Sequence, residues 1–271
     1  GSMLLQGSSQ LEFNSDYSLN AGSTLSGGTV RFSSGTVLVN GRYEVSGATL
    51  VTGGTVTFGS NANVVNWGSR VEIGSATVNL NLGKAVILPN LLFTGNSLSS
   101  SDSITVTGVM TWSGGTLSGS GTTVALGGLV LNTSGTKLLD GRVLDNVGAT
   151  IWSGGWLYLN RSAVFTNRVG ATFDVRFDGS VSYNVSPVGV FNNQGSLVKS
   201  AGSGATSFDA ALNNSGSVTV SSGTLKLSGG GANNGSMLLQ GSSQRGVEHE
   251  SGLVRRRPPR RGPGPVRGGA G

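Results

Sequence analysis

Apolar and polar residues alternate with a period of two in many short runs of this chain. The clearest run covers 172–178, where every second residue is apolar: Phe173, Val175 and Phe177. This alternation is typical of β-strands with one buried face. Gly-Gly, Asn-Gly and Ser-Gly pairs separate the runs and can supply the positive-φ corners of turns. No segment of useful length has a helical period, so the pattern predicts short strands joined by tight turns.

The sequence repeats on two length scales. Residues 1–10, Gly-Ser-Met-Leu-Leu-Gln-Gly-Ser-Ser-Gln, recur unchanged as residues 235–244, so that one unit covers 1–234. We therefore expect one complete unit of a tandem array plus the start of the next, with the chain beginning inside a longer protein. Within the unit, Asn followed by Gly and an apolar run recurs at intervals of about 22 residues, a length typical of one solenoid coil. The glycines of this shorter repeat are Gly148, Gly170, Gly195, Gly216 and Gly235.

Strand-type units of this length indicate a β-solenoid, because each unit can bury its apolar face only by stacking on its neighbours. The alternation argues against helical and leucine-rich repeats. We predict an all-β fold over residues 1–244, a parallel β-helix with two or three short strands per coil. Coils stacked at about 4.8 Å and numbering roughly 11 would form a rod about 50 Å long.

The recurring asparagines have a structural role in this prediction. At a tight inward corner, each side-chain amide can bond to the asparagine of the next coil and so form a ladder. The alternative is that asparagine only tolerates the left-handed turn conformation there. Neither interpretation implies catalysis. The predicted ladder residues are Asn146, Asn167, Asn193, Asn214 and Asn234.

The second half of the unit resembles a known kind of bacterial surface protein. The segments 190–204 and 211–231 contain Phe-Asn-Asn-Gln-Gly-Ser-Leu and Leu-Asn-Asn-Ser-Gly-Ser-Val, each followed by a polar, glycine-rich turn. They are similar to repeats of autotransporter-passenger and filamentous-haemagglutinin-like β-helix proteins, most clearly over 141–231. The resemblance implies a right-handed parallel β-helix that is secreted or displayed on the cell surface, often as an adhesin or its stalk. It transfers no catalytic residue to this chain.

Composition excludes several kinds of chemistry. The chain has 271 residues with no Cys, and His249 is its only histidine. A disulfide framework, a thiol nucleophile and a multi-histidine metal site are therefore excluded, and we expect no cofactor or metal. No apolar run reaches the roughly 20 residues of a membrane helix, and residues 1–10 lack the pattern of a signal peptide.

Two groups of side chains are candidates for a ligand-binding face. Tryptophans can stack on sugars, although core packing is the alternative for the two that share a Trp-Ser-Gly-Gly motif: Trp112 and Trp152. Trp156 is the third candidate. The polar face of 172–178 offers Asp174, Arg176 and Asp178, for which the alternative is a solvated, ion-paired surface.

The sequence also bears on two other kinds of surface chemistry. The carboxylates of one strand are too far apart for a glycosidase pair, which needs about 5–9.5 Å. We therefore expect no enzyme. Threonine pairs occur at Thr55/Thr57 and Thr105/Thr107. Because the two pairs are well separated in the sequence, no flat threonine face is predicted.

Residues 245–271 differ from the rest of the chain in composition. They carry seven arginines and two glutamates, whereas 1–244 is nearly neutral. We predict a disordered tail rich in Arg, Pro and Gly. No aromatic residue interleaves its arginines, so specific nucleic-acid recognition is not expected. The exact repeat stops at Gln244, and a one-base shift of suitable codons restores its register, which suggests a frameshifted next repeat.

Together with the resemblance, which implies a secreted or surface-displayed bacterial protein, these observations predict a structural and adhesive segment of such a protein. Its partners would be neighbouring repeats of the same array and a glycan or cell-surface ligand, and its location would be extracellular or at the cell surface. The alternative is a carbohydrate-active β-helix enzyme or a tailspike-like polysaccharide-binding module.

Overall fold

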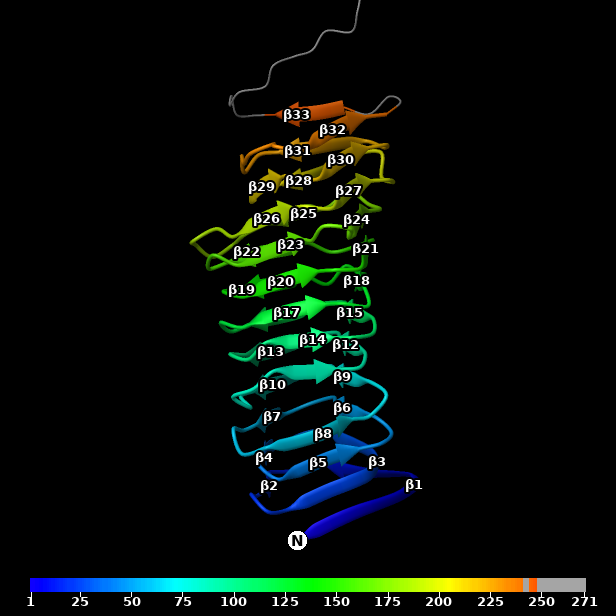
Figure 1. Ribbon diagram of the computed structural model, residues 1–271, viewed down its shortest axis with the longest axis vertical. Helices are drawn as coiled ribbons and strands as arrows, with labels where there is room; N and C mark the ends of the chain where they lie inside the picture. The colour runs from blue at the N-terminus through cyan, green and yellow to red at the C-terminus, as the bar shows by residue number, and fades with distance from the viewer. Residues whose placement is uncertain (241–243, 248–271) are drawn as a thin grey trace, which may run out of the picture.

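The strands stack in parallel along one axis and form a β-solenoid of about 11 turns (Figure 1). This computed structural model describes residues 1–240 and the backbone of 244–247. No α-helix occurs in these residues, which confirms the predicted all-β parallel solenoid and its number of coils. The predicted tail lies almost wholly outside them, but strand β33 spans Gln244–Val247 and continues the pairing beyond the predicted boundary.

Three parallel sheets form the sides of the solenoid. Sheet 1 has 14 strands, with β3 paired to β1, β5 and β6, and Figure 1 shows its strands from β6 to β30 along one side. Its strands are β1 (Ser2–Phe13), β3 (Thr24–Phe32), β5 (Arg42–Val45), β6 (Thr49–Val51), β8 (Asn63–Trp67), β9 (Val71–Ile73), β12 (Leu91–Phe93), β15 (Met110–Trp112), β18 (Leu129–Leu131), β21 (Ala149–Trp152), β24 (Thr172–Val175), β27 (Ser196–Lys199), β30 (Ser217–Val220) and β32 (Ser236–Leu239).

Sheet 2 has 12 strands that pair in simple succession along the whole described rod. They are β2 (Tyr17–Leu19), β4 (Thr36–Val39), β7 (Thr55–Phe58), β10 (Ala76–Leu80), β13 (Asn96–Ser100), β16 (Gly115–Ser118), β19 (Lys137–Asp140), β22 (Leu157–Asn160), β25 (Ser180–Ser182), β28 (Ala205–Phe208), β31 (Thr224–Leu227) and β33.

Sheet 3 has seven strands and covers the third side from the fifth coil onward. They are β11 (Val86–Leu88), β14 (Ile104–Val106), β17 (Thr122–Ala125), β20 (Val143–Asn146), β23 (Val164–Asn167), β26 (Val190–Asn193) and β29 (Ala211–Asn214). In earlier coils β5, β8 and the first part of β3 take this place, because each is followed by a strand of sheet 1 and then one of sheet 2.

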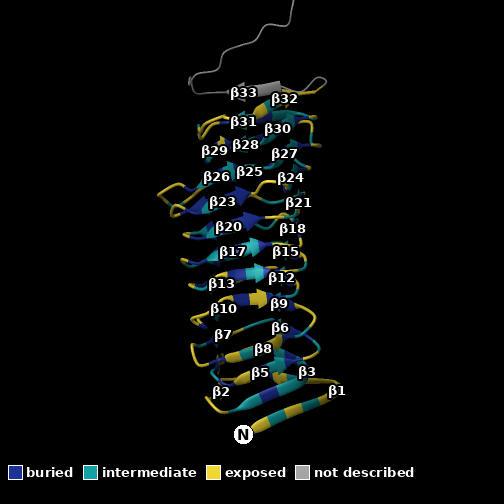
Figure 2. Cartoon of the chain, viewed as in Figure 1, coloured by how far each residue is buried: buried dark blue, intermediate teal, exposed yellow. Residues whose placement is uncertain are grey.

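The core fills the inside of the stacked coils. Within each strand, buried and partly exposed residues alternate, as in β30 with its buried Val218 and Val220. In Figure 2 the buried residues lie along the strands, whereas exposed residues concentrate at the turns. Phe165 and Phe191 stack across neighbouring coils with ring centroids 4.8 Å apart. The short alternating runs form strands because each buries one row of side chains between the coils above and below.

Candidate functional site: the inner amide ladder, the corner cations and the outer faces

Four of the predicted asparagines form a ladder on the inner side of sheet 3. The Nδ2 of each donates to the Oδ1 of the next, at 2.9 Å from Asn146 to Asn167, 2.8 Å from Asn167 to Asn193 and 2.7 Å from Asn193 to Asn214. All four side chains are buried. Each Nδ2 also donates to a carbonyl of the following coil, as Asn193 does to Ser217 O at 2.9 Å. The ladder therefore links side-chain amides to the backbone of the next corner.

The last rung is Asn233, not the predicted Asn234. Asn214 Nδ2 donates to Asn233 Oδ1 at 2.7 Å, and these two residues also pair through their backbones. The ladder asparagine stands two residues before a glycine at this rung, as it does at Asn193-Gln194-Gly195. A Cβ on Gly216 would lie 2.0 Å from Gly195 O, so glycine is required where successive coils come this close. At the doublet Asn233-Asn234 the Asn-x-Gly spacing is therefore the sequence signal for the correct rung, although Asn167 stands three residues before Gly170.

The ladder begins abruptly at Asn146. Its register partner in the preceding coil is the buried Ala125, and before that the same inward position holds Val106 and Leu88. Asn146 Oδ1 is buried and has no hydrogen-bond partner among the described residues. One inward column thus changes from apolar packing in the first half of the rod to amide bonding in the second.

Three buried cations lie at corners of the coils, and the sequence analysis missed all of them. Lys137 Nζ donates to Gly154 O at 2.7 Å, to Thr133 O at 3.1 Å and to Asn132 O. Burial lowers the pKa of Lys137 to about 8. A Cβ on Gly155, which has φ +71°, would lie 2.1 Å from the backbone oxygen of Gly135 and 2.6 Å from this ammonium nitrogen. Lys137 thus caps carbonyls at a corner where only glycine leaves room for it.

Arg142 also donates to backbone carbonyls, and these belong to more distant coils than those bound by Lys137. Its guanidinium donates to Ser100 O, to Asp102 O at 3.0 Å and to Thr122 O at 3.3 Å, and its Nε donates to Thr123 Oγ1 at 2.7 Å. These acceptors belong to two earlier coils. Burial lowers the pKa of Arg142 to about 10, and the charge of Asp102 opposes this shift. The side chain fastens three coils together at one corner.

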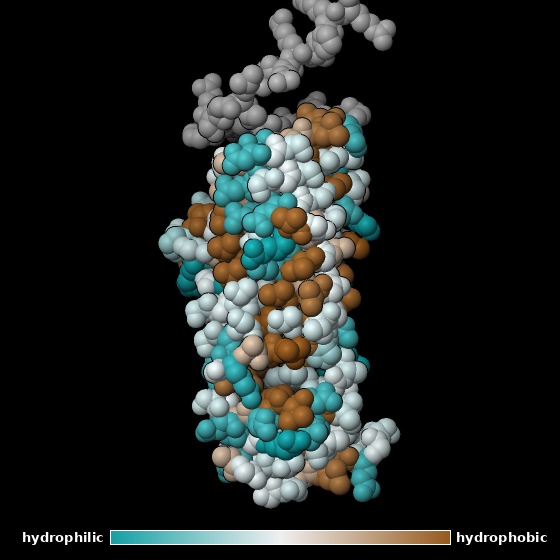
Figure 3. Space-filling view, in the orientation of Figure 1, coloured by the Kyte–Doolittle hydropathy of each residue, from teal (hydrophilic) through white to brown (hydrophobic). Residues whose placement is uncertain are grey.

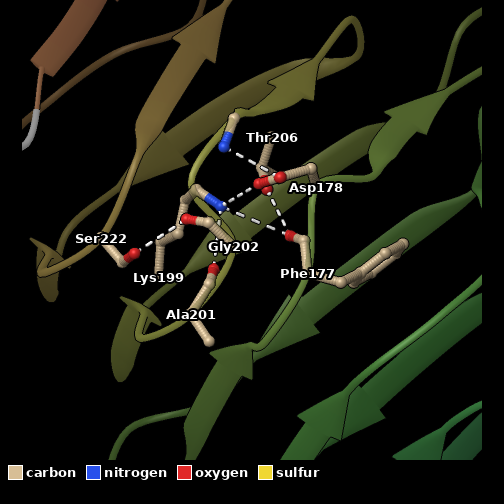
Figure 4. Close-up of polar contacts among 8 residues, drawn as sticks. Phe177, Asp178, Lys199, Ala201, Gly202, Thr206 and Ser222 are labelled. Atoms are coloured by element: carbon tan, nitrogen blue, oxygen red, sulfur yellow. Dashed lines mark hydrogen bonds and ion pairs between the residues drawn. The ribbon is translucent and has the colours of Figure 1, made fainter.

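The third cation, Lys199, meets one of the predicted ligand-face residues. Lys199 Nζ lies 2.8 Å from Asp178 Oδ1 and donates to Ala201 O at 3.0 Å (Figure 4). The other oxygen of Asp178 accepts from Gly204 N at 2.9 Å. The hydrogen bond from Lys199 holds the pKa of Asp178 below its usual range; burial opposes this, and the Gly204 amide supports it. The Lys199 side chain is only 1% exposed, so this ion pair has a structural role and does not offer Lys199 to a ligand.

The alternating run of 172–178 ends earlier than its pattern suggests. Strand β24 stops at Val175, so Asp178 lies in the following turn and not on the face of Asp174. Asp174 instead pairs with Arg176, Oδ2 to Nε, at 2.6 Å on the surface. The three polar candidates therefore do not form one site.

The tryptophan candidates separate into two kinds. Trp112 and Trp152 are fully buried and cannot touch a ligand, because both occupy inward strand positions. Their Nε1 atoms donate to Gly114 O and Gly155 O at 3.1 and 3.0 Å. Trp156 is 52% exposed, and its ring meets Tyr158 edge-on with centroids 5.9 Å apart.

The outer surface of sheet 2 carries a column of hydroxyl groups in strict register. It was not predicted, because the sequence does not show which residues of different coils lie side by side. Toward its C-terminal end the column reaches Leu138 and Tyr158. The face in view in Figure 3 mixes white, teal and brown groups along the rod. The hydroxyl column consists of Thr36, Thr55, Thr77, Ser97 and Thr116.

Every carboxylate of the described residues has a partner. Seven form ion pairs with Arg or Lys, and the other three accept hydrogen bonds: Asp16 from Thr36 N, Asp102 from Leu82 N and Gly83 N, and Asp209 from Ser180 Oγ. The described residues contain no cluster of His, Asp and Glu able to hold a metal ion. They also contain no helix long and apolar enough to cross a membrane.

Comparison with known proteins gives no family assignment. No family model, curated protein or solved structure matches this chain.

Proposed function

We propose that this chain is a structural segment of a secreted or surface-displayed bacterial protein, and that it holds one lateral face for contact with glycans. The proposal rests mainly on the positions of the polar groups of the described residues. The buried amides and cations bond to the turns of neighbouring coils, and the carboxylates are all engaged in ion pairs or hydrogen bonds. This arrangement supports a rod more than a catalytic cleft.

The similarity of 141–231 to filamentous-haemagglutinin-like and autotransporter-passenger repeats supports the same role. In such a protein, neighbouring repeats of the array would be the first partners of this segment. Extracellular display follows from that resemblance and belongs to the proposal.

The outer side of sheet 2 is the favoured contact face. The exposed Trp156 and the partly buried Tyr158 form an aromatic pair, and the hydroxyl column leads away from Tyr158 in strand register. Sugars combine apolar ring faces with hydroxyl groups, so an aromatic platform beside a row of hydroxyls matches their chemistry. The regular spacing of the hydroxyl column suits an extended chain of sugars more than a single sugar ring.

The test is a glycan array probed with the full chain, together with a reducing-end assay on the bound polysaccharides. We expect saturable binding without release of reducing ends, and loss of at least tenfold in affinity in Trp156→Ala. Ile87→Ala, which removes a 63% exposed side chain from sheet 3, is the matched control and should bind normally. Release of reducing ends, or binding that Trp156→Ala leaves unchanged, would overturn the proposal.

A further inference from the structure

The outer side of sheet 2 carries a second column of polar groups beside the hydroxyl column. Strand residues alternate between the two sides of a sheet, so each outward residue is followed two residues later by another, about 6.6 Å further along the strand. The residues between them, such as Val56 and Leu98, are buried and fix this orientation. The second column consists of Thr57, Asn79, Ser99 and Ser118, which are register partners. Together with Thr55, Thr77, Ser97 and Thr116 of the same strands, they form what we call the polar face.

Hydrogen bonds between neighbouring coils hold side chains of the polar face in place. Asn79 Nδ2 donates to Thr57 Oγ1 at 3.2 Å, and Ser97 Oγ donates to Thr77 Oγ1 at 3.4 Å. A hydroxyl group has one donor and two acceptor sites, so these groups keep bonding capacity for a ligand. The side chains are partly exposed in all four strands. The polar face is therefore ordered before a ligand arrives, which lowers the entropy cost of binding.

The polar face carries no charge. Its strands β7, β10, β13 and β16 contain no Asp, Glu, Lys or Arg. The next residue of the second column is Asp140, whose carboxylate already forms an ion pair with Arg161. An ionised ligand would lose hydration on this face without gaining an ion partner, and that loss is costly. The hydroxyl and amide groups suit a ligand that is rich in neutral hydroxyl groups.

The position of the aromatic pair sets a minimum length for a ligand that contacts both it and the polar face. Thr55 and Tyr158 belong to one register column and are separated by five strand spacings, about 24 Å at about 4.8 Å per strand. Leu138 lies between the polar face and Tyr158 and joins them through an apolar contact surface. A single sugar ring cannot bridge this distance, whereas an extended sugar chain along the rod axis can.

We propose that the polar face and the aromatic pair form one binding site for an uncharged polysaccharide that lies extended along the rod. Its ring faces would stack on Trp156 and Tyr158. Its hydroxyl groups would exchange hydrogen bonds with both columns of the polar face. This inference rests on the proposed function, because it names the class of glycan and adds the second column to the contact surface.

Neutral and charged polymers with the same backbone test the class of ligand. The full chain is titrated by calorimetry with dextran, hydroxyethyl cellulose and galactomannan, and with the carboxymethyl derivative of each. High salt in every titration screens the attraction between carboxylates and the seven arginines of 245–271. We expect each neutral polymer that binds to do so at least tenfold more tightly than its carboxymethyl derivative. Equal or tighter binding of the charged derivative would overturn the inference and leave glycan contact in place, whereas failure of every polymer to bind would overturn both proposals.

Fragment length tests whether one ligand spans the whole site. Linear fragments of a neutral polymer that binds are compared with the intact polymer in the same titration. We expect the affinity to rise with fragment length up to about 24 Å and then to level off. Fragments well below this length that bind as tightly as the polymer would contradict an extended site.

Substitutions on the polar face test the second column. Thr57→Val with Ser99→Ala removes two hydroxyl groups of that column and leaves the buried residues of the same strands unchanged. We expect this double variant to bind the neutral polymer at least fivefold more weakly, with the melting temperature of the unmodified chain. Thr105→Val is the matched control, because Thr105 is an outward residue of sheet 3, and it should bind normally. Unchanged affinity in the double variant would overturn the inference, whereas a loss in Trp156→Ala alone would still support the proposed function.

Discussion

The amide ladder predicts that the same substitution, Asn to Ala, lowers the free energy of unfolding by different amounts at two different rungs. Asn193 is an interior rung: its Nδ2 donates to Asn214 Oδ1, Ser217 O and Gly195 O, and its Oδ1 accepts from Asn167. Asn193→Ala leaves Asn214 Oδ1 buried without a donor and removes the bond to Ser217 O. With about 1–3 kcal/mol for each buried group left unpaired, we expect a loss of about 3–5 kcal/mol in the free energy of unfolding.

Asn146 is the end rung, and its loss should cost less. Its Oδ1 is already unpartnered, so Asn146→Ala removes one orphan oxygen and creates another at Asn167. The bonds to Gly148 O and Thr172 O are lost, at 3.0 and 3.3 Å. The preceding coil already holds alanine at this position, as Ala125. We expect a loss of about 1–2 kcal/mol.

Equilibrium unfolding in guanidinium chloride, followed by far-UV circular dichroism, measures both variants. Asn213→Ala is the matched control, because Asn213 is an exposed neighbour whose Nδ2 donates to Asn192 at 3.1 Å. Its cost should stay below about 1 kcal/mol. Equal losses for Asn193→Ala and Asn146→Ala would refute the ladder reasoning, since they would show that hydrogen bonding between rungs does not set the cost.

The buried cations, their carboxylate partner and the tryptophans give three other predictions. The folded pKa of Lys137 is below that of the unfolded chain, so stability should rise with pH between about 8 and 10, and Lys137→Met should flatten this rise in unfolding experiments. Asp178→Asn should destabilise the protein by about 1–2 kcal/mol near neutral pH, a value reduced because the carboxylate is 37% exposed. The folded pKa of Asp178 is lowered, so the difference in unfolding free energy between the unmodified chain and Asp178→Asn should be complete above pH ~4. It should vanish as the pH falls through the folded pKa. A difference that stays constant down to pH ~2 would contradict the ion pair. Trp152→Ala should cost about 3–5 kcal/mol, whereas Trp156→Ala should leave the melting temperature nearly unchanged.

The sequence was sufficient for the architecture because alternation and repetition are local properties. The period-two runs identified strands, and the recurrence of Asn followed within three residues by Gly located four rungs of the ladder. Asn234 was wrong by one residue, because the doublet Asn233-Asn234 offers two choices and only the two-residue distance to glycine distinguishes them.

The outer faces could not be predicted for a different physical reason. The hydroxyl column joins residues of five coils that differ in length, from Thr36 to Thr116, so its register depends on the turns. The buried Lys137 and Lys199 also escaped notice, although Lys199 follows Leu197 at an inward position of an alternating strand. A charged residue in an apolar position was a usable signal, but its carbonyl acceptors come from turns that only the fold brings together.

The register of sheet 2 is the most direct test of the solenoid. Thr36 and Ser182 occupy one column, separated by seven strand spacings, although they lie far apart in the sequence. Spin labels on Thr36→Cys/Ser182→Cys should give a single narrow distance by pulsed electron resonance, about 34 Å at about 4.8 Å per strand. Labels on Thr36→Cys/Thr116→Cys, four spacings apart, should give about 19 Å. Distances that do not scale with the number of strands between the labels, or a broad distribution, would contradict the parallel stack.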